Sequence, residues 1–275
     1  MTRFLVVPQW QGSPSTRAMT LIDGAEAIAG DLPRSATQRI DVPVEAGEAL
    51  DTGVRRYSSL ARTRDLLAAA LESADADGSE GIGVVIGGDC GVAVPAIAAA
   101  AARHPRLALV WFDAHGDLHT AETSPSGAFG GMALRAALGD GPLAATHPVA
   151  PERTVLVGAR DLDPAEDEFV AGSGIRVIST SDLDDPASLA DAVSTTGADA
   201  VYIHVDLDVL DPAAVTGVGF SVPFGVDAGA LTRAVGVLRE RLPLAGASIS
   251  GFAPAVPDAA VDDMGTILRI VGSLA

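Results

Sequence analysis

The sequence predicts an α/β protein whose parallel sheet is covered by helices on both faces. Short apolar runs rich in valine and isoleucine alternate along the chain with longer segments rich in alanine and leucine. Such alternation indicates βαβ units, which bury a parallel sheet between layers of helices. The 275 residues are enough for one large domain, and no repeat or low-complexity linker divides them. We therefore expect a single domain over residues 1–275.

The predicted strands are short runs that consist mostly of apolar residues. Residues 107–112 read Leu-Ala-Leu-Val-Trp-Phe, which is typical of a strand buried on both faces. The Phe-Leu-Val-Val run at 4–7 also reads as a strand. The predicted strands cover residues 4–7, 83–86, 107–112, 154–157, 175–178, 201–205 and 247–252.

The predicted helices are the longer segments rich in alanine and leucine that separate these strands. They cover residues 15–29, 57–74, 94–103, 131–138, 164–171, 188–194, 228–242 and 261–274. The stretch at 139–151 contains proline and glycine and is predicted to be a surface loop.

Charge and composition argue against nucleic-acid and membrane partners and indicate a reducing compartment. The formal net charge is −18 and the chain contains no lysine. A field of that sign repels phosphate backbones, so we expect no nucleic-acid partner, although the same acidity also serves solubility. The single cysteine excludes a disulfide within the chain and fits a reducing compartment. No signal peptide or apolar stretch of roughly 20 residues is present, so we expect a cytoplasmic protein without a membrane partner.

Three polar clusters follow predicted strands directly. In a parallel sheet, functional side chains collect at the carboxyl ends of the strands. Three such ends lying next to one another would bring four carboxylates, one imidazole and one thiol together. The clusters read Gly87-Gly88-Asp89-Cys90, Asp113-Ala114-His115-Gly116-Asp117 and Asp206-Leu207-Asp208.

A metal site explains these clusters best. Four neighbouring aspartates cannot all stay ionised without a counter-charge, which one metal ion or two would supply. Carboxylate-rich ligation with one imidazole suits Mn²⁺ or Mg²⁺, with Zn²⁺ and Fe²⁺ as competitors. The period of two places Asp113, His115 and Asp117 on one side of an extended stretch. The alternative, in which each aspartate caps the following helix, explains one such residue more readily than five acidic and histidine residues.

These motifs, in this order, resemble the signatures of the arginase and agmatinase (ureohydrolase) superfamily. The matching segments are Gly-Gly-Asp, Trp-Phe-Asp-Ala-His-Gly-Asp, Thr-Ser-Pro-Ser-Gly and Asp-Leu-Asp-Val-Leu-Asp-Pro, and the match covers most of the chain. The resemblance implies a three-layer α/β/α sandwich with a central, mainly parallel sheet. It also implies a pair of metal ions, usually Mn²⁺, with a bridging hydroxide that attacks a guanidinium-type carbon.

The resemblance assigns metal ligands residue by residue. Asp113 and Asp206 resemble the ligands that bridge both ions. His115 and Asp208 match ligands of one ion, and Asp117 matches a ligand of the other. Asp117 is also a candidate to steer the attacking water or to relay protons.

Cys90 departs from the family pattern, which has a histidine ligand of the second ion at this place. A thiolate suits Zn²⁺ or Fe²⁺ better than Mn²⁺. The position is therefore either a retuned metal ligand or a buried inert thiol beside a single ion, and the sequence leaves both open.

On the substrate side, Asp163 and Glu166 resemble residues that hold an α-amino group, and Ser126 resembles one near the α-carboxylate. These matches favour an amino-acid substrate. His119 stands where the family usually has asparagine, and is a candidate substrate contact or proton shuttle, or else a polar loop residue. His204 is either a hydrogen-bond partner of a ligand carboxylate or a core histidine with a backbone partner.

Three substrate-side positions depart from the family. Gly130 replaces a histidine thought to shuttle protons, and Ala128 replaces an asparagine. The acidic residue that clamps the guanidinium falls at about Gly251. Because an unpaired guanidinium in a closed pocket is costly, plain arginine is a poor fit for this chain.

The pairing of Gly-Gly-Asp-Cys with Gly-Gly-Met resembles a minor branch that hydrolyses hydroxyarginine to hydroxyurea and ornithine. A hydroxyguanidine is far less basic than a guanidine and needs less charge pairing. We therefore predict a metal-dependent hydrolase of linear C–N bonds in an amidine or guanidine compound, such as N-hydroxyarginine. The alternative is an impaired or non-catalytic relative that retains one metal site. The resemblance also allows a homo-oligomer, since relatives are often trimers or hexamers.

Overall fold

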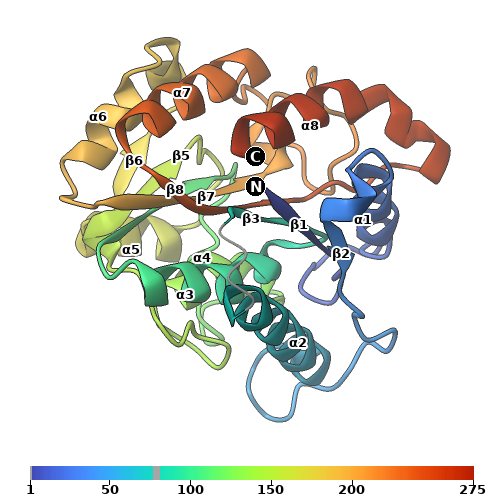
Figure 1. Ribbon diagram of the computed structural model, residues 1–275. Helices are drawn as coiled ribbons and strands as arrows, with labels where there is room; N and C mark the ends of the chain where they lie inside the picture. The colour runs from blue at the N-terminus through green and yellow to red at the C-terminus, as the bar shows by residue number, and fades with distance from the viewer. Residues whose placement is uncertain (1, 77–80) are drawn as a thin grey trace.

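A computed structural model describes residues 2–76 and 81–275, which contain one sheet of eight strands (Figure 1). The strands are β1 (Arg3–Val7), β2 (Thr37–Arg39), β3 (Gly83–Gly87), β4 (Leu107–Phe112), β5 (Thr154–Val157), β6 (Arg176–Ile178), β7 (Ala200–Asp206) and β8 (Leu244–Ser250). Their order is β2-β1-β3-β8-β7-β4-β5-β6, and each neighbouring pair is parallel. The prediction of a parallel sheet is confirmed.

Helices cover both faces of the sheet, so the three-layer prediction is also confirmed. The helices are α1 (Thr20–Gly30), α2 (Tyr57–Ala76), α3 (Ala93–Arg103), α4 (Ala133–Ala137), α5 (Pro164–Ser173), α6 (Ser188–Ser194), α7 (Ala228–Arg241) and α8 (Ala260–Leu274). In Figure 1, α1, α6, α7 and α8 lie on one face, and α2, α3, α4 and α5 lie on the other. No helix of the described ranges is both long and apolar enough to cross a membrane.

The central strands supply side chains to two separate cores. In β4, Ala108, Val110 and Phe112 pack toward α1, α6, α7 and α8, whereas Leu109 and Trp111 pack toward α2, α3 and α4. All of them are buried. This alternation follows from the period of two in a strand, and it explains why the run at 107–112 is apolar throughout.

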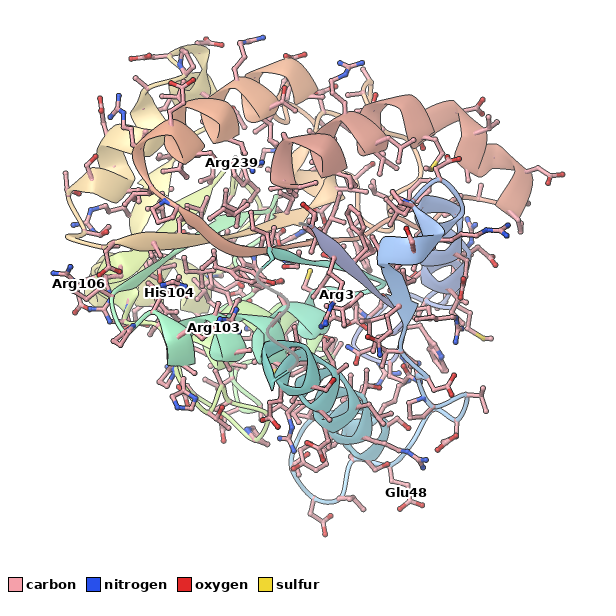
Figure 2. The ribbon with its side chains drawn as sticks, viewed as in Figure 1. Arg3, Glu48, Arg103, His104, Arg106 and Arg239 are labelled. Carbon is pink, nitrogen blue, oxygen red and sulfur yellow. The ribbon has the colours of Figure 1, made fainter. Side chains whose placement is uncertain are left out.

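Two arginines labelled in Figure 2 tie helices to their neighbours. Arg239 of α7 donates to the carbonyl oxygens of Ser273 and Ala275 at the end of α8. Arg3, at the start of β1, donates to the carbonyl oxygen of Ala70 in α2 at 3.1 Å. The first pair of bonds joins α7 to α8, and the bond from Arg3 holds α2 against β1.

Some element boundaries differ from the prediction. The helix predicted at 15–29 begins only at Thr20, because the hydroxyls of Ser13 and Ser15 accept backbone N–H groups and hold the preceding residues in turns. The strand predicted at 247–252 runs from 244 to 250. Strand β2 was not predicted.

The strand order decides which side chains can meet at the site. The strands β3, β7 and β4, which precede the three polar clusters, are not all neighbours, because β8 lies between β3 and β7. The carboxyl end of β8 therefore adds Ser250 and Gly251 to the group, and Ser250 pairs in register with Asp206.

Candidate functional site

A cavity of about 300 Å³ lies at the carboxyl ends of the central strands. Its lining includes all six of the side chains that the sequence nominates as metal ligands: Cys90, Asp113, His115, Asp117, Asp206 and Asp208. The structure therefore brings these residues together, although they come from loops as much as 118 positions apart in the chain, from 90 to 208.

The backbone turns sharply at both aspartate motifs. Asp113 Oδ1 accepts the N–H of His115 at 2.8 Å, and Asp206 Oδ1 accepts the N–H of Asp208 at 2.9 Å. Asp117 has a left-handed backbone, with φ of 52°. The expectation that Asp113, His115 and Asp117 share one side of an extended stretch is thus wrong, because local turns, not strand alternation, gather the side chains.

One group of possible ligands surrounds His115. Its Nδ1 lies 3.1 Å from Asp208 Oδ2 and 3.4 Å from Asp113 Oδ1. Although burial opposes protonation, hydrogen bonds to Asp113 and Asp208 raise the pKa of His115 to about 12. An imidazolium here supplies a positive charge that these carboxylates demand, and a metal ion could supply the same charge.

A second group surrounds Cys90. Its thiol lies 2.9 Å from Asp206 Oδ2, which also accepts a hydrogen bond from Ser250 Oγ at 3.1 Å. Asp117 Oδ2 is buried and has no hydrogen-bond partner among the described residues. A buried carboxylate oxygen without a partner is costly, so this atom fits a missing cation.

The pKa shifts of these side chains also indicate a site for a cation. Burial, followed by the charge of Asp113, raises the pKa of Asp117 well above its usual range. Burial and the neighbouring charge of Asp206 do the same to the pKa of Asp208. Burial and then Asp206 also hold the pKa of Cys90 well above its usual range. The residues therefore fit one or two divalent ions, which would allow the carboxylates to ionise together.

Behind the cluster, polar side chains of the sheet hold the carboxylates in place. Trp111 Nε1 donates to Asp113 Oδ2 at 3.1 Å. His204 is fully buried, and its partners are the hydroxyls of Ser248 and Ser250 rather than a backbone carbonyl. Of these residues, Trp111, Ser248 and Ser250 were not predicted as part of the site, because no motif marks them.

The substrate-side candidates are only partly gathered. His119 and Glu166 line the cavity. His119 Nε2 lies 3.1 Å from Asp163 Oδ2, and its Nδ1 lies 3.2 Å from Thr123 Oγ1. Ser126 is half-buried outside the cavity lining, and its hydroxyl accepts the N–H of Ala128.

Asp163 and Glu166 also have a structural role at the start of α5. Asp163 Oδ1 accepts the N–H groups of Ala165 and Glu166, and Glu166 Oε2 accepts the N–H of Asp163. The two residues form a capping box. Glu166 Oε1 accepts the N–H of Leu118, so both oxygens of Glu166 and Asp163 Oδ1 are bonded to the backbone. The fourth oxygen, Asp163 Oδ2, contacts the His119 side chain instead.

Gly251 and Gly130, which stand where the family pattern has an acidic residue and a histidine, leave little room for a side chain. A Cβ atom at Gly251, where φ is 86°, would lie 2.2 Å from Asp206 Oδ1. A Cβ atom at Gly130 would lie 3.1 Å from the carbonyl oxygen of Gly12, which accepts the N–H of Gly130. The cavity is thus shaped around the absence of side chains at both positions.

Comparisons with known proteins agree with this geometry. The sequence matches the profile of the Arginase family over residues 24–268. It is 36% identical to the arginase of Bacillus caldovelox over 202 residues, which are 68% of this chain and 67% of that protein. It is 32% identical to the N(omega)-hydroxy-L-arginine amidinohydrolase of Streptomyces lavendulae over 219 residues, 78% of this chain and 77% of that protein. The fold matches the native structure of the Bacillus caldovelox arginase with a TM-score of 0.86 and 28% identity, over 99% of this chain and 97% of that one.

Proposed function

Because this chain belongs to the arginase family, we propose that it is a metal-dependent amidinohydrolase that acts on an N-hydroxyguanidine, with Nω-hydroxy-L-arginine as its substrate. The reaction adds water across the hydroxyguanidine carbon and releases ornithine and hydroxyurea. The relative from Streptomyces lavendulae, whose name states this substrate, supports the proposal.

The observation that carries the proposal is the lack of a free carboxylate for a guanidinium cation. Of the acidic side chains that line the cavity, four belong to the proposed metal ligands, here called the ligand cluster: Asp113, Asp117, Asp206 and Asp208, with Cys90 and His115. The other two in the described lining are Asp89 and Glu166, whose oxygens already accept N–H groups. The family's acidic position falls at about Gly251, where a Cβ atom would lie 2.2 Å from Asp206 Oδ1. A less basic hydroxyguanidine avoids the cost of burying an unpaired charge.

Two charged side chains in and beside the cavity suit an amino-acid substrate. Asp163 is outside the cavity lining but contacts His119, which lines it, and the 39% exposed Asp163 side chain offers Oδ2 as an acceptor for an α-ammonium group. Arg17 lines the cavity and offers a cation for an α-carboxylate. Both ring nitrogens of His119 already have partners, so in this proposal His119 positions Asp163.

When bound, the metal ions lower the pKa of water and supply the nucleophile that attacks the hydroxyguanidine carbon. Asp113 and Asp206 would hold both ions, with His115 and Asp208 on one and Cys90 and Asp117 on the other. Asp117, whose Oδ2 has no partner in the described part of the chain and would meet the ion, would also take a proton from the attacking water through its carboxylate.

Substrate discrimination tests the proposal. The protein is reconstituted with Mn²⁺, and ornithine release is measured from hydroxyarginine and from arginine. Putrescine release from agmatine is the control for a substrate that lacks the carboxylate. A lost charge-assisted hydrogen bond costs about 1.5–3 kcal/mol, so we expect kcat/KM for hydroxyarginine to exceed that for arginine by roughly 10- to 100-fold. A preference for arginine would contradict the proposed substrate. No turnover of any guanidino compound at full metal loading would favour the non-catalytic alternative.

A further inference from the structure

His204 is a buried imidazole for which the proposed chemistry has no use. It lies on β7 two residues before Asp206, so the two side chains share one face of the sheet. Its ring stacks on Trp111 with a centroid distance of 3.8 Å, and its Nδ1 lies 2.8 Å from Ser248 Oγ. The register of the sheet places Trp111, His204 and Ser248 side by side. The ring is therefore anchored on its Nδ1 side.

The other ring nitrogen is less well satisfied. His204 Nε2 makes only a long contact in the described structure, 3.4 Å to Ser250 Oγ. When Nδ1–H is donated to the Ser248 hydroxyl, Nε2 carries the lone pair. A metal-bound histidine has this arrangement, because its second nitrogen donates to a fixed acceptor.

Cys90, Asp113 and His204 lie close enough together for a coordination site. One ligand atom each from Cys90, Asp113 and His204 lie within 4.8 Å of one another, and all three residues are buried. Ligand atoms around one ion with bonds of about 2.0–2.3 Å are separated by roughly 3–4.5 Å. Shifts of a few tenths of an ångström would bring all three onto one ion. Asp206 Oδ2 lies 2.9 Å from Cys90 Sγ, so an ion on the thiolate would also be within reach of this carboxylate.

We propose that His204 Nε2 and Cys90 Sγ bind the same metal ion, together with Asp113 and Asp206. In the family pattern the histidine ligand of this ion follows Gly-Gly-Asp, where this chain has Cys90. Here the imidazole would come from His204 of β7 instead. This inference rests on the proposed function, because it assumes that the ligand cluster holds a second ion.

The donor set predicts which metal occupies each position. A thiolate with an imidazole suits Zn²⁺, Fe²⁺ or Co²⁺ better than Mn²⁺. The position at His115 is richer in carboxylates and better suits Mn²⁺. The pKa of Cys90 is high in the metal-free protein, but a coordinated thiol loses its proton. The two positions would therefore hold different metals, with Zn²⁺, Fe²⁺ or Co²⁺ at Cys90 and His204 and Mn²⁺ at His115.

X-ray absorption of bound Zn²⁺ tests the coordination without a measurement of turnover. The His115→Asn variant removes the imidazole of the other position, and one equivalent of Zn²⁺ is added to the metal-free protein. We expect one sulfur at about 2.3 Å and one imidazole nitrogen at about 2.0–2.1 Å on the same zinc. Sulfur without imidazole, or imidazole without sulfur, would overturn the proposal.

Two further substitutions, each added to the His115→Asn variant, show which histidine supplies the imidazole bound to zinc. Asparagine at position 204 retains a polar group near Ser248 but lacks Nε2, so His204→Asn should lose the imidazole signal and bind Zn²⁺ at least about 100-fold more weakly. His119→Asn is the matched control and should retain the signal. Loss of the signal in the control, or its survival in a folded His204→Asn variant, would overturn the proposal. If His204→Asn does not fold, the His115→Asn spectrum and the control still decide.

The two proposals fail in different ways. A zinc held by sulfur and imidazole in a native protein that does not hydrolyse hydroxyarginine would refute the proposed substrate alone. Hydrolysis of hydroxyarginine by a protein whose zinc carries no second imidazole would refute the role of His204 alone.

Discussion

Gly251 and Asp206 are so close that a Cβ atom on the glycine would lie 2.2 Å from the carboxylate oxygen Oδ1. Gly251 also has a positive φ of 86°, a region that favours glycine. The backbone of this segment is therefore adapted to a glycine beside the cluster. An acidic side chain placed there would strain the backbone and crowd Asp206.

We expect Gly251→Glu to destabilise the protein without creating arginine hydrolysis. The left-handed backbone alone costs about 1–2 kcal/mol for a side chain, and the contact with Asp206 adds to this. Chemical denaturation measures the loss, and Gly251→Ala is the control, because it shares the strain but adds no charge. A Gly251→Glu protein with native stability and a gain in arginine turnover would contradict this account.

We expect Cys90→His to raise the Mn²⁺ content of the purified protein. An imidazole is a better ligand for Mn²⁺ than a thiol, so the content should increase from about one toward two ions per chain. Elemental analysis measures the stoichiometry, and Cys90→Ser, which offers neither donor, should remain near one. A gain of turnover with the second ion would mark the cluster as catalytic, whereas full loading without turnover would favour the non-catalytic alternative.

We expect Asp163→Asn to weaken substrate binding without loss of the fold. Asparagine caps a helix as well as aspartate does, so α5 should remain intact, but the charge that would meet an α-ammonium group is lost. A charged hydrogen bond of about 1.5 kcal/mol corresponds to a rise in KM for hydroxyarginine of roughly tenfold, with kcat little changed. Asp163→Ala should lose both functions and about 1 kcal/mol of stability. An unchanged KM in Asp163→Asn would exclude this contact.

The metal-free protein should lose stability as the pH rises above neutrality. Hydrogen bonds to Asp113 and Asp208 outweigh burial and raise the pKa of His115 to about 12, whereas an unfolded histidine titrates near 6.5. Between these values the folded state retains a proton that the unfolded chain has lost. The free energy of unfolding therefore falls by up to about 1.4 kcal/mol per pH unit.

Bound Mn²⁺ would displace that proton, so stabilisation by the metal should grow with pH. Urea denaturation at pH 7, 8 and 9, with a chelator or with Mn²⁺, measures both slopes. Equal slopes in the two series would show that no ion replaces the proton of His115.

Most of the fold was predictable because its signals are local. The buried strands β4 and β5 were predicted at the observed residues, since each is a continuous apolar run. Strand β2 was not predicted, because its three residues, Thr-Gln-Arg, are polar and lie at the edge of the sheet. A short edge strand is specified by pairing with β1 and leaves no hydrophobic pattern of its own.

The six candidate ligands that line the cavity could be named from the sequence, but the residues around them could not. The aspartates and His115 follow apolar runs and form recognisable motifs. The place of β8 between β3 and β7 is a property of the chain topology, and no local pattern reports it. Ser250 therefore emerged only from the structure, as did the contact between His204 and Ser248. The contact between His119 Nε2 and Asp163 Oδ2 likewise joins residues 44 positions apart, from 119 to 163.

Anomalous X-ray scattering at the manganese edge tests most directly whether the carboxylates share a cation. Crystals of the protein grown with Mn²⁺ should show an anomalous peak in contact with oxygens of both Asp113 and Asp206, and with His115. A well-ordered cavity at saturating Mn²⁺ with no peak at these carboxylates would contradict the metal site and the hydrolytic function derived from it.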